Sequence, residues 1–398
     1  MLGNSSKNVN KSLILALICL LAVVSESAID MYMPVFNLMA IDMGIDVSYI
    51  QMTLSSYLFG MALSPIIVGY LSDKFGRKII TLVLLFIYCV FTTLIIFSTD
   101  IYTFIAFRFV TGFCAAFATV IAMTLLTDVF QGKFLAMAFT VATLAWACIP
   151  TFSPVIGAYI TYATSYKFIF IAIIILGVLA FLLYLFFIPE TIENKKTSDT
   201  NLIEIFRETF KVKSFRVGAY ISSIIYGLYM SYVIVSPIIY KELYSLNYIE
   251  IGHIQLIYGS AYLIGTILNF ILLKRATVRD SNRLGVIFIS LGITLLMLAT
   301  IIKHDSYLFF LIPMSIIELS TGLLFPNFCS YSLSEIKSNI GTASSILTTM
   351  QFGACSILTI FCLFIVDESL IIFSFFNLFL ILTILVVIFF SDQKRNVN

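Results

Sequence analysis

Apolar segments of about 20 residues recur along nearly the whole chain, and each is long enough to cross the ~30 Å hydrocarbon core of a lipid bilayer. We count twelve, at residues 12–34, 49–71, 79–98, 101–123, 135–160, 167–189, 215–240, 251–273, 284–302, 306–330, 342–364 and 369–390. A lone span has no neighbouring strand to satisfy its backbone, and a barrel would show alternating segments of about 10 residues. Only 11% of the residues are charged, against roughly 25% in soluble domains. The sequence therefore predicts an all-α integral membrane protein with twelve transmembrane helices.

A charged stretch divides the twelve segments into two groups of six. We therefore expect an N-terminal six-helix bundle over 1–189, a cytoplasmic linker over 190–214 and a C-terminal six-helix bundle over 215–398. Apolar residues at helical spacing in the linker fit either a helix on the inner membrane surface or a solvated tether. The six-plus-six layout suggests two bundles that rock about a site at mid-membrane, as in many secondary transporters.

The distribution of charge orients the chain. If both termini lie on one side, nearly all of the 23 Lys and Arg residues fall on that side, and the other side receives Lys167, Lys241 and Lys303. The positive-inside rule then places both termini in the cytoplasm. The net charge of +2 thus reflects topology and does not indicate nucleic-acid binding. A secretory signal cleaved near Ala28 is the alternative for the N-terminus, but it would leave the basic C-terminus on the wrong side.

Residues typical of enzymes and metal sites are sparse. The seven cysteines all fall within the apolar segments without a CxxC pair, and the two histidines, His253 and His304, are far apart. No HExxH or GxSxG motif is present. The sequence therefore favours a protein without a cofactor or metal and argues against a membrane-embedded enzyme.

The loop between the second and third segments, GYLSDKFGRK, carries a specific pattern. Gly69 permits close helix approach, Gly76 can adopt positive φ in a tight turn, and Asp73 can accept hydrogen bonds from a helix N-terminus. Arg77 could pair with Asp128, which ends the fourth segment on the same side. The loop resembles the signature loop of the major facilitator superfamily, G-x-x-x-D-x-x-G-R-K/R, matched at Gly69, Asp73, Gly76, Arg77 and Lys78.

Two further stretches resemble the same superfamily. RFVTGFCAA at 108–116 is similar to its fourth-span pattern through Arg108 and Gly112, with Thr111 where a glutamine is usual. PTFSPVIGA at 150–158 resembles the antiporter pattern of the fifth span. That match is partial, and it is carried by Pro150, Pro154 and Gly157.

The stretch IDMYMP at 29–34 resembles the first-span motif of drug:proton antiporters, especially the bicyclomycin- and chloramphenicol-resistance (Bcr/CflA) branch. The resemblance covers the first half of the chain, and the second half lacks the D-x-x-G-R pattern. It implies a monomeric antiporter of the bacterial inner membrane that exports small amphipathic molecules, such as drugs or metabolites, in exchange for protons by alternating access. An importer or uniporter of a small nutrient is the alternative.

Four ionisable residues fall inside the predicted spans, namely Glu26, Asp30, Arg108 and Glu318. If the first span ends near Pro34, Asp30 lies roughly 6 Å and Glu26 roughly 12 Å below the outer boundary, level with Arg108, and Glu318 lies roughly 18 Å deep. Charged groups at such depths face a partner or a water-filled cavity. Arg108 can compensate one carboxylate, whereas the other acids are expected to bind protons.

The acids of the first span are therefore candidates for proton coupling. Glu26 and Asp30, at i and i+4, share one helix face and should titrate as a coupled pair. We expect Asp30 to be the carrier, because the motif match includes it, and Glu26 to assist. The alternatives are that Asp30 caps the helix or reaches the outer interface, and that Glu318 is a structural hydrogen-bond partner and no substrate ligand.

Aromatic residues offer a candidate lining for the site. An amphipathic cavity could be formed by Tyr32, Tyr57, Trp146, Tyr226 and Tyr229. Aromatic residues near span ends also serve as interface anchors, which is the alternative. An acidic site favours cationic or zwitterionic molecules, while Arg108 leaves neutral or anionic ones open.

Overall fold

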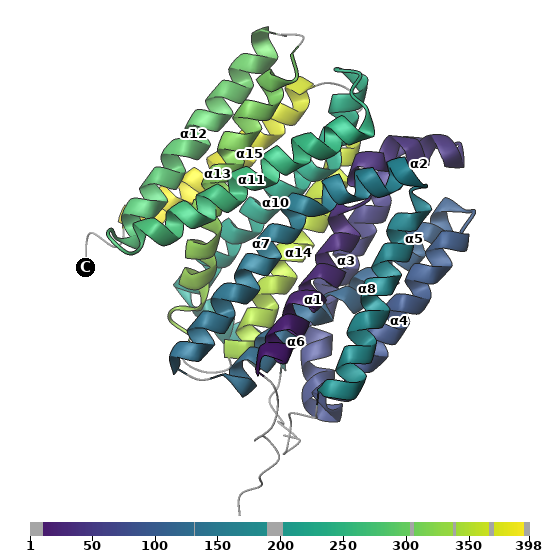
Figure 1. The fold of residues 1–398 in the computed structure, drawn as a ribbon. Coiled ribbons are helices and arrows are strands. Elements are labelled where there is room, and N and C mark those ends of the chain that lie inside the picture. The colour runs from purple at the N-terminus through teal and green to yellow at the C-terminus, as the bar shows by residue number, and fades with distance from the viewer. Residues whose placement is uncertain are drawn as a thin grey trace, which may run out of the picture.

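The computed structural model describes residues 11–130, 132–188, 202–302, 306–336, 340–365 and 370–393, and all regular structure in these ranges is helical. The elements, drawn in Figure 1, are α1 (Lys11–Asp30), η2 (Met33–Val35), α2 (Phe36–Met43), α3 (Val47–Phe75), α4 (Arg77–Phe97), α5 (Ile101–Ala115), α6 (Phe117–Val129), α7 (Gly132–Ala163), α8 (Lys167–Phe187), α9 (Leu202–Lys211), α10 (Lys213–Glu242), α11 (Tyr248–Leu272), α12 (Val278–Ile302), α13 (Leu308–Leu333), α14 (Ile340–Ile365) and α15 (Leu370–Gln393). Within the described residues, twelve helical runs are long and apolar enough to cross a membrane, as predicted. We call the end of the bundle where α1 begins the inner end.

The first span differs from its prediction. Pro34 does not end it, because the chain continues through η2 and α2, and the apolar run extends over Lys11–Met43. Proline is tolerated there because it lies in the first positions of the short η2 helix, where a backbone N–H has no intrahelical acceptor. The apolar run thus continues from Asp30 to Met43, and Pro34 is not the outer boundary from which the roughly 6 Å depth was estimated.

The helices form two six-helix bundles. In the first bundle α1 packs against α7 and α8, and α5 against α3 and α4; in the second α13 packs against α10, α11 and α12. The bundles meet where α3 lies along α14 and α7 along α11 (Figure 1). Of the spanning helices, α10 has the largest buried share, 83% of its most apolar window. Side chains on α10 are therefore well placed to contact both bundles.

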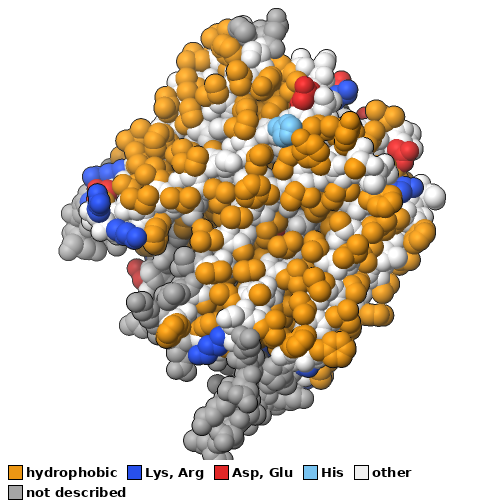
Figure 2. Space-filling model, in the orientation of Figure 1, with side chains coloured by type: hydrophobic (Ala, Val, Ile, Leu, Met, Phe, Trp, Pro, Cys, Tyr) orange, Lys and Arg blue, Asp and Glu red, His pale blue; other side chains and the backbone are white. Residues whose placement is uncertain are grey.

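The outer surface of the bundle is apolar. Figure 2 shows hydrophobic side chains over most of the visible face, with charged side chains toward its margins. The helices α4, α8 and α15 are only 33% buried over their most apolar windows. Because so much hydrocarbon would be exposed in water, this surface fits a lipid environment.

Part of the linker is helical. The short helix α9 lies against the beginning of α10 and against α14. Its Phe210 ring lies 4.5 Å from that of Phe206 and 5.4 Å from that of Phe215 on α10, measured between centroids. A helix is thus present over Leu202–Lys211, whereas its position relative to a membrane stays a prediction and residues 190–201 lie outside the described part.

Neutral side chains fasten the inner end of the second bundle. Asn269 of α11 and Asn327 of α13 exchange hydrogen bonds of 3.2 Å in both directions. Asn327 also donates to Asn282 of α12 at 2.8 Å, and Ser281 donates to Asn269 at 2.6 Å. These four residues, which we call the amide network, hold three helices together.

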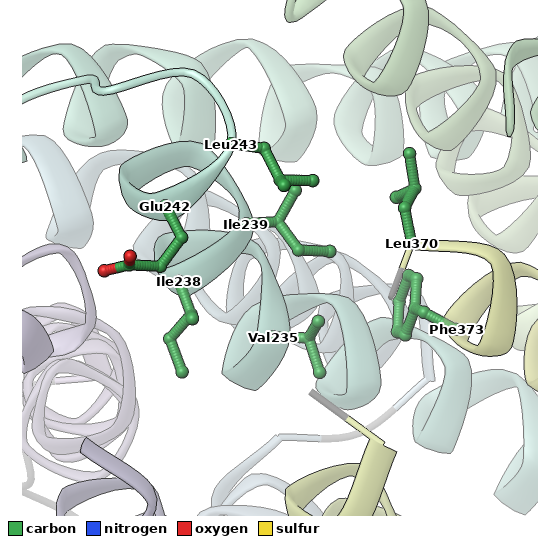
Figure 3. Close-up of a pocket in the computed structure, with 7 residues that line it drawn as sticks. All are labelled: Val235, Ile238, Ile239, Glu242, Leu243, Leu370 and Phe373. Carbon is green, nitrogen blue, oxygen red and sulfur yellow. The ribbon is translucent and has the colours of Figure 1, made fainter. Parts of the chain in front are cut away.

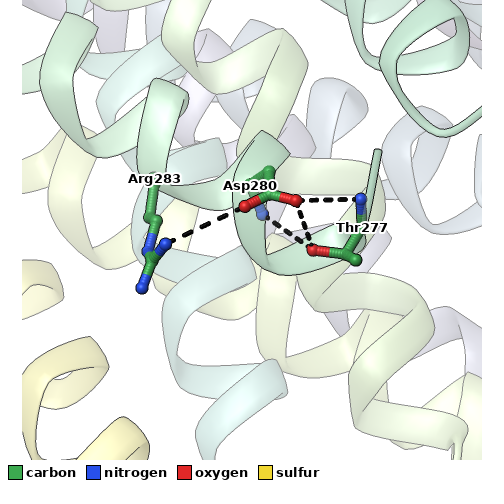
Figure 4. Close-up of polar contacts among 3 residues, drawn as sticks. All are labelled: Thr277, Asp280 and Arg283. Atoms are coloured by element: carbon green, nitrogen blue, oxygen red, sulfur yellow. Dashed lines mark hydrogen bonds and ion pairs between the residues drawn. The ribbon is translucent and has the colours of Figure 1, made fainter. Parts of the chain in front are cut away.

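The adjoining turn is closed by a capping box at the start of α12 (Figure 4). Asp280 accepts hydrogen bonds from the backbone N–H and the hydroxyl of Thr277, and its own N–H donates to the Thr277 hydroxyl. The guanidinium of Arg283 lies 3.9 Å from the Asp280 carboxylate. This turn and the amide network lie where the second half lacks the D-x-x-G-R pattern.

Candidate functional site

Arg108 is fixed inside the first bundle by α1 and α3. Its Nη2 donates to the backbone oxygen of Ala28 at 2.7 Å and to the hydroxyl of Tyr32 at 3.1 Å. Its guanidinium carbon lies 4.7 Å from the centroid of the Tyr32 ring and 4.2 Å from that of Tyr57. Arg108 is 1% exposed, so two aromatic faces replace most of its hydration.

The structure corrects the expectation that Arg108 compensates a carboxylate directly. Among the residues that the structure describes, the ion pairs are Lys211 with Glu208 and Arg283 with Asp280, both at the surface. Arg108 is stabilised by the carbonyl dipole and the two ring faces, and among the described residues no cation is in contact with Glu26 or Asp30. The same contacts show that Tyr32 and Tyr57, which are fully buried, enclose Arg108 and do not line an open cavity.

Asp30 lies where the two bundles meet. It is the last residue of α1 and is 0% exposed. One carboxylate oxygen accepts a hydrogen bond of 3.3 Å from the hydroxyl of Tyr229 on α10. The other has no hydrogen-bond partner among the described residues. The alternative that Asp30 reaches the outer interface is therefore wrong, because the span continues past it and the second bundle covers it.

Glu26 lies one helical turn before Asp30 on the same helix and is 6% exposed. The backbone beside it is fastened to the first bundle, since the hydroxyl of Tyr57 donates to the oxygen of Ser25 and that of Tyr88 to the oxygen of Val24, both at 2.9 Å. Tyr57 thus braces both α1 and Arg108. The two acids of α1 are held on a rigid segment next to the second bundle.

Glu318 lies on α13 in the second bundle and is 1% exposed. It accepts a hydrogen bond of 2.8 Å from the hydroxyl of Tyr258 on α11. The Tyr258 ring stacks on Tyr232 at 3.8 Å and on Tyr229 at 6.2 Å, with interplanar angles of 24° and 11°. This hydrogen bond is compatible with the alternative that Glu318 is a structural partner, and Tyr258 is a partner that the sequence reasoning missed.

The predicted aromatic residues divide into two groups. Tyr226 and Tyr229 of α10 and Trp146 of α7 remain partly exposed, unlike Tyr32 and Tyr57. The rings of Tyr226 and Tyr229 stack at 6.1 Å with an angle of 16°. Residues 226, 229 and 232 recur every third position, and this spacing was the one signal in the sequence for a tyrosine row on α10.

The fifth-span motif holds α7 against both bundles. A Cβ added at Gly157 would lie 1.8 Å from the backbone oxygen of Met31, so only glycine fits beside the end of α1. On the opposite side, a Cβ at Gly259 of α11 would lie 2.8 Å from the Cα of Thr151. Both Pro150 and Pro154 lie within the continuous helix α7. Through these two contacts α7 packs both against the end of α1, which carries Glu26 and Asp30, and against α11 of the second bundle.

The loop at 69–78 forms a one-residue turn. Gly76 has φ of +105°, the positive value that the sequence predicted, and the ammonium of Lys78 donates to the backbone oxygen of Leu185 at 2.9 Å. Gly69 faces α14, but a Cβ added there would lie 3.8 Å from Ser345 Oγ, which is ordinary contact. Close helix approach is therefore not what this glycine provides here. The side chains of Asp73 and Asp128 lie outside the described part, and their roles stay predictions.

Hydrogen bonds close the outer half of the interface between the bundles. Six of them join described residues of opposite bundles. They connect Asn37 to Pro237, Gln51 to Ile234, Ser55 to both Thr359 and Ser356, Tyr159 to His253, and Tyr229 to Asp30. The acids of α1 are thus shielded from the outer side.

A small apolar hollow lies away from these acids, between the outer ends of α10 and α15 (Figure 3). It is lined by Val235, Ile238, Ile239, Glu242, Leu243, Leu370 and Phe373. Within the described residues, no group of three or more His, Cys, Asp and Glu is placed to hold a metal ion. The candidate site is therefore the set of buried acids, Arg108 and tyrosines at the bundle interface.

Two bundles of six membrane helices around buried charged residues define a secondary transporter. The family model described as "Major Facilitator Superfamily" matches residues 18–359, and the chain belongs to this superfamily. A protein called an uncharacterized transporter, from Rickettsia bellii, is 27% identical over 317 residues, covering 77% of this chain and 78% of that protein.

A bicyclomycin resistance protein homolog from Haemophilus influenzae is 26% identical, covering 85% of this chain and 86% of that protein. The resemblance to the bicyclomycin-resistance branch is thereby confirmed. Among solved structures, a D-xylose-proton symporter superposes with a TM-score of 0.74 at 17% identity, covering 94% of this chain and 96% of that one. This likeness confirms the fold.

Proposed function

We propose that this transporter is a proton-coupled antiporter that exports small amphipathic molecules. The observation that carries the proposal is Asp30, a fully buried carboxyl at the bundle interface with Tyr229 as its hydrogen-bond partner and no cation in contact among the described residues. A buried carboxylate without a counter-charge is costly. Such a group can carry one proton when it is neutral and release it when water or a cationic substrate reaches it.

Alternating access supplies the change in exposure. The six hydrogen bonds listed above close the outer side, so Asp30 is reached from outside only after they break. Rocking of the bundles would then expose Asp30 to protons outside and, in the other conformer, to the cytoplasm. Glu26 lies on the same helix face, one turn away. Its negative charge favours the neutral, protonated form of Asp30 and so assists proton binding there. Arg108 stays with its ring partners and positions the end of α1.

The substrate class follows from the partly exposed groups near this site. The rings of Tyr226 and Tyr229 present apolar faces beside the acids of α1, and this combination suits amphipathic molecules with a positive charge. The name of the Haemophilus relative makes bicyclomycin the first drug to test. We assign the protein to a bacterial inner membrane, with both termini cytoplasmic as the charge distribution predicts, and the 69–78 loop to the inner gate between α3 and α14.

The test is transport in proteoliposomes under an imposed pH gradient, with bicyclomycin and the cationic dye ethidium as probes. We expect Asp30→Asn to abolish uphill export while downhill exchange persists, and Glu26→Gln to have a smaller effect. Asp42→Asn, the same change at an exposed residue of α2, is the matched control and should transport normally. Gradient-driven accumulation by Asp30→Asn, Glu26→Gln and the double variant would refute the proposal and favour an importer or uniporter.

A further inference from the structure

A short sequence is repeated, in modified form, in corresponding spans of the two bundles. Residues 108–112 read RFVTG in the fourth span, and residues 318–322 read ELSTG in the tenth. In both, the threonine hydroxyl donates to the backbone oxygen of the charged residue three positions earlier. The distance is 3.0 Å from Thr111 to Arg108 and 2.7 Å from Thr321 to Glu318. The two segments therefore have the same local geometry.

The glycine of each segment also makes the same helix crossing. A Cβ added at Gly112 would lie 2.0 Å from the backbone oxygen of Tyr57 on α3, and one at Gly322 would lie 2.4 Å from that of Tyr262 on α11. At the same crossings, a Cβ added at Gly60 would lie 2.2 Å from the backbone oxygen of Phe109, and one at Gly265 would lie 2.1 Å from that of Leu319. Since Gly60 and Gly265 each follow the tyrosine by three residues, the two halves match position by position.

Glu318 is therefore the counterpart in the second bundle of Arg108 in the first. The surroundings differ in a way that suits the opposite charge. Arg108 is stabilised by ring faces and a carbonyl, whereas Glu318 accepts a hydrogen bond from Tyr258 and has no ion pair among the described residues. Tyrosine ring faces attract cations and repel anions. For a carboxyl group buried among tyrosines, the neutral form with a bound proton is more stable than the ionised form.

The titratable groups near Glu318 on neighbouring helices are tyrosines, and the hydroxyl of Thr321 on its own helix lies beside it as well. Tyr258 and Tyr262 come from α11, and Tyr229 and Tyr232 from α10. The charged residues of α12 described in this structure lie in its first turns, at 279, 280 and 283, far along the helix from Gly292, which contacts α13 beside Glu318. No fixed cation therefore opposes a change of protonation at Glu318 among the described residues.

We propose that Glu318 is a second proton-binding site of the transport cycle, linked to Asp30 through the stacked rings of Tyr258 and Tyr229. The link follows from contacts already described, since Tyr258 donates to Glu318, its ring lies parallel to that of Tyr229, and Tyr229 donates to Asp30. When the bundles separate, Tyr229 leaves Asp30, the stack shifts, and the donor to Glu318 moves with it. One proton then passes between the Glu318 carboxyl and water.

This inference rests on the proposed antiport, but its test needs no transported molecule. Detergent-purified protein is titrated from about pH 5 to about pH 9, the range in which buried carboxyl groups exchange protons, and bound protons are counted. We expect Glu318→Gln to bind about one proton fewer than the unmodified chain. Glu335→Gln, at an exposed residue just beyond α13, is the matched control and should leave the count unchanged.

Infrared difference spectra over the same range assign the proton. We expect Glu318→Gln to lose one carboxylic C=O band and Tyr258→Phe to move that band, because the 2.8 Å donor is removed while the ring stays. An unchanged proton count and spectrum in Glu318→Gln would overturn this proposal and leave the role of Asp30 intact. An unchanged spectrum in Asp30→Asn would count against the antiport mechanism itself, so the two failures are distinguishable.

Discussion

The hydrogen bond from Tyr229 to Asp30 should stabilise the conformer in which the outer side is closed, and Tyr229→Phe isolates its contribution. The substitution removes the hydroxyl and keeps the ring that stacks on Tyr226 and Tyr258. It leaves Asp30 without its single described side-chain donor, while its other oxygen already has no described partner. In an open conformer water would hydrate the carboxyl, so the penalty falls on the closed one.

The expected size follows from the geometry. An unsatisfied buried acceptor costs about 1–3 kcal/mol, and the 3.3 Å distance is longer than the usual range for O–H···O bonds. We therefore expect the lower part of that range, about 1–2 kcal/mol, to be lost from the closed conformer. This corresponds to an outer opening that is about 5-fold to 30-fold more populated.

Hydrogen–deuterium exchange reports this opening directly, because amide exchange in α2 and in the outer part of α10 follows the opening equilibrium. Exchange in residues 36–43 and 230–242 should accelerate by the same factor in Tyr229→Phe. Tyr226→Phe is the matched control, since its hydroxyl makes none of the hydrogen bonds described between the bundles. Equal exchange in the two variants would refute the reasoning, because it would show that the Tyr229–Asp30 hydrogen bond does not stabilise the closed conformer.

Two further predictions concern packing and capping. Gly157→Ala should lower transport and the apparent melting temperature, at a cost of about 1–3 kcal/mol, because its Cβ would overlap the oxygen of Met31; Gly353→Ala, with its nearest atom at 3.9 Å, should be nearly silent. Asp46 caps α3 and its pKa lies below the ordinary value because its side chain accepts from the hydroxyl and backbone N–H of Ser48. The cap therefore stabilises the folded protein fully above the unfolded-state pKa of Asp46. This stabilisation is lost as the pH falls through the pKa of Asp46 in the folded state. Asp46→Ala should destabilise at neutral pH by about 1 kcal/mol and less in acid, and equal melting shifts at both pH values would contradict this.

The sequence predicted the number, type and approximate bounds of the spans, because the length and hydropathy of each segment are local properties. The positive φ of Gly76 was predicted for a similar reason, since a one-residue turn between two helices restricts its own backbone. Pro34 shows the limit of local reasoning. Proline ends a helix unless a new turn starts at the same place, and that depends on what packs around α2.

The partners of the buried charges could not be predicted. The number of acids and bases in the spans suggested that Arg108 would meet a carboxylate, yet its contacts are a carbonyl and two rings. Depth alone places residues at one level but does not say which way their side chains point. Likewise the Tyr258 hydroxyl that meets Glu318 is 60 residues away in sequence, and among 21 tyrosines nothing local marks it.

The amide network gives the two halves of this transporter different sensitivities to ionic strength. Salt screens interactions between charges over about 10 Å at 0.1 M, but it has little effect on hydrogen bonds between buried neutral amides. The inner end of the first bundle carries Arg77 and Lys78. The inner end of the second also carries charges, among them the Asp280–Arg283 pair, but its helices are joined by hydrogen bonds among Asn269, Asn282 and Asn327. A change in salt at the inner end should therefore leave the contacts that join α11, α12 and α13 unchanged.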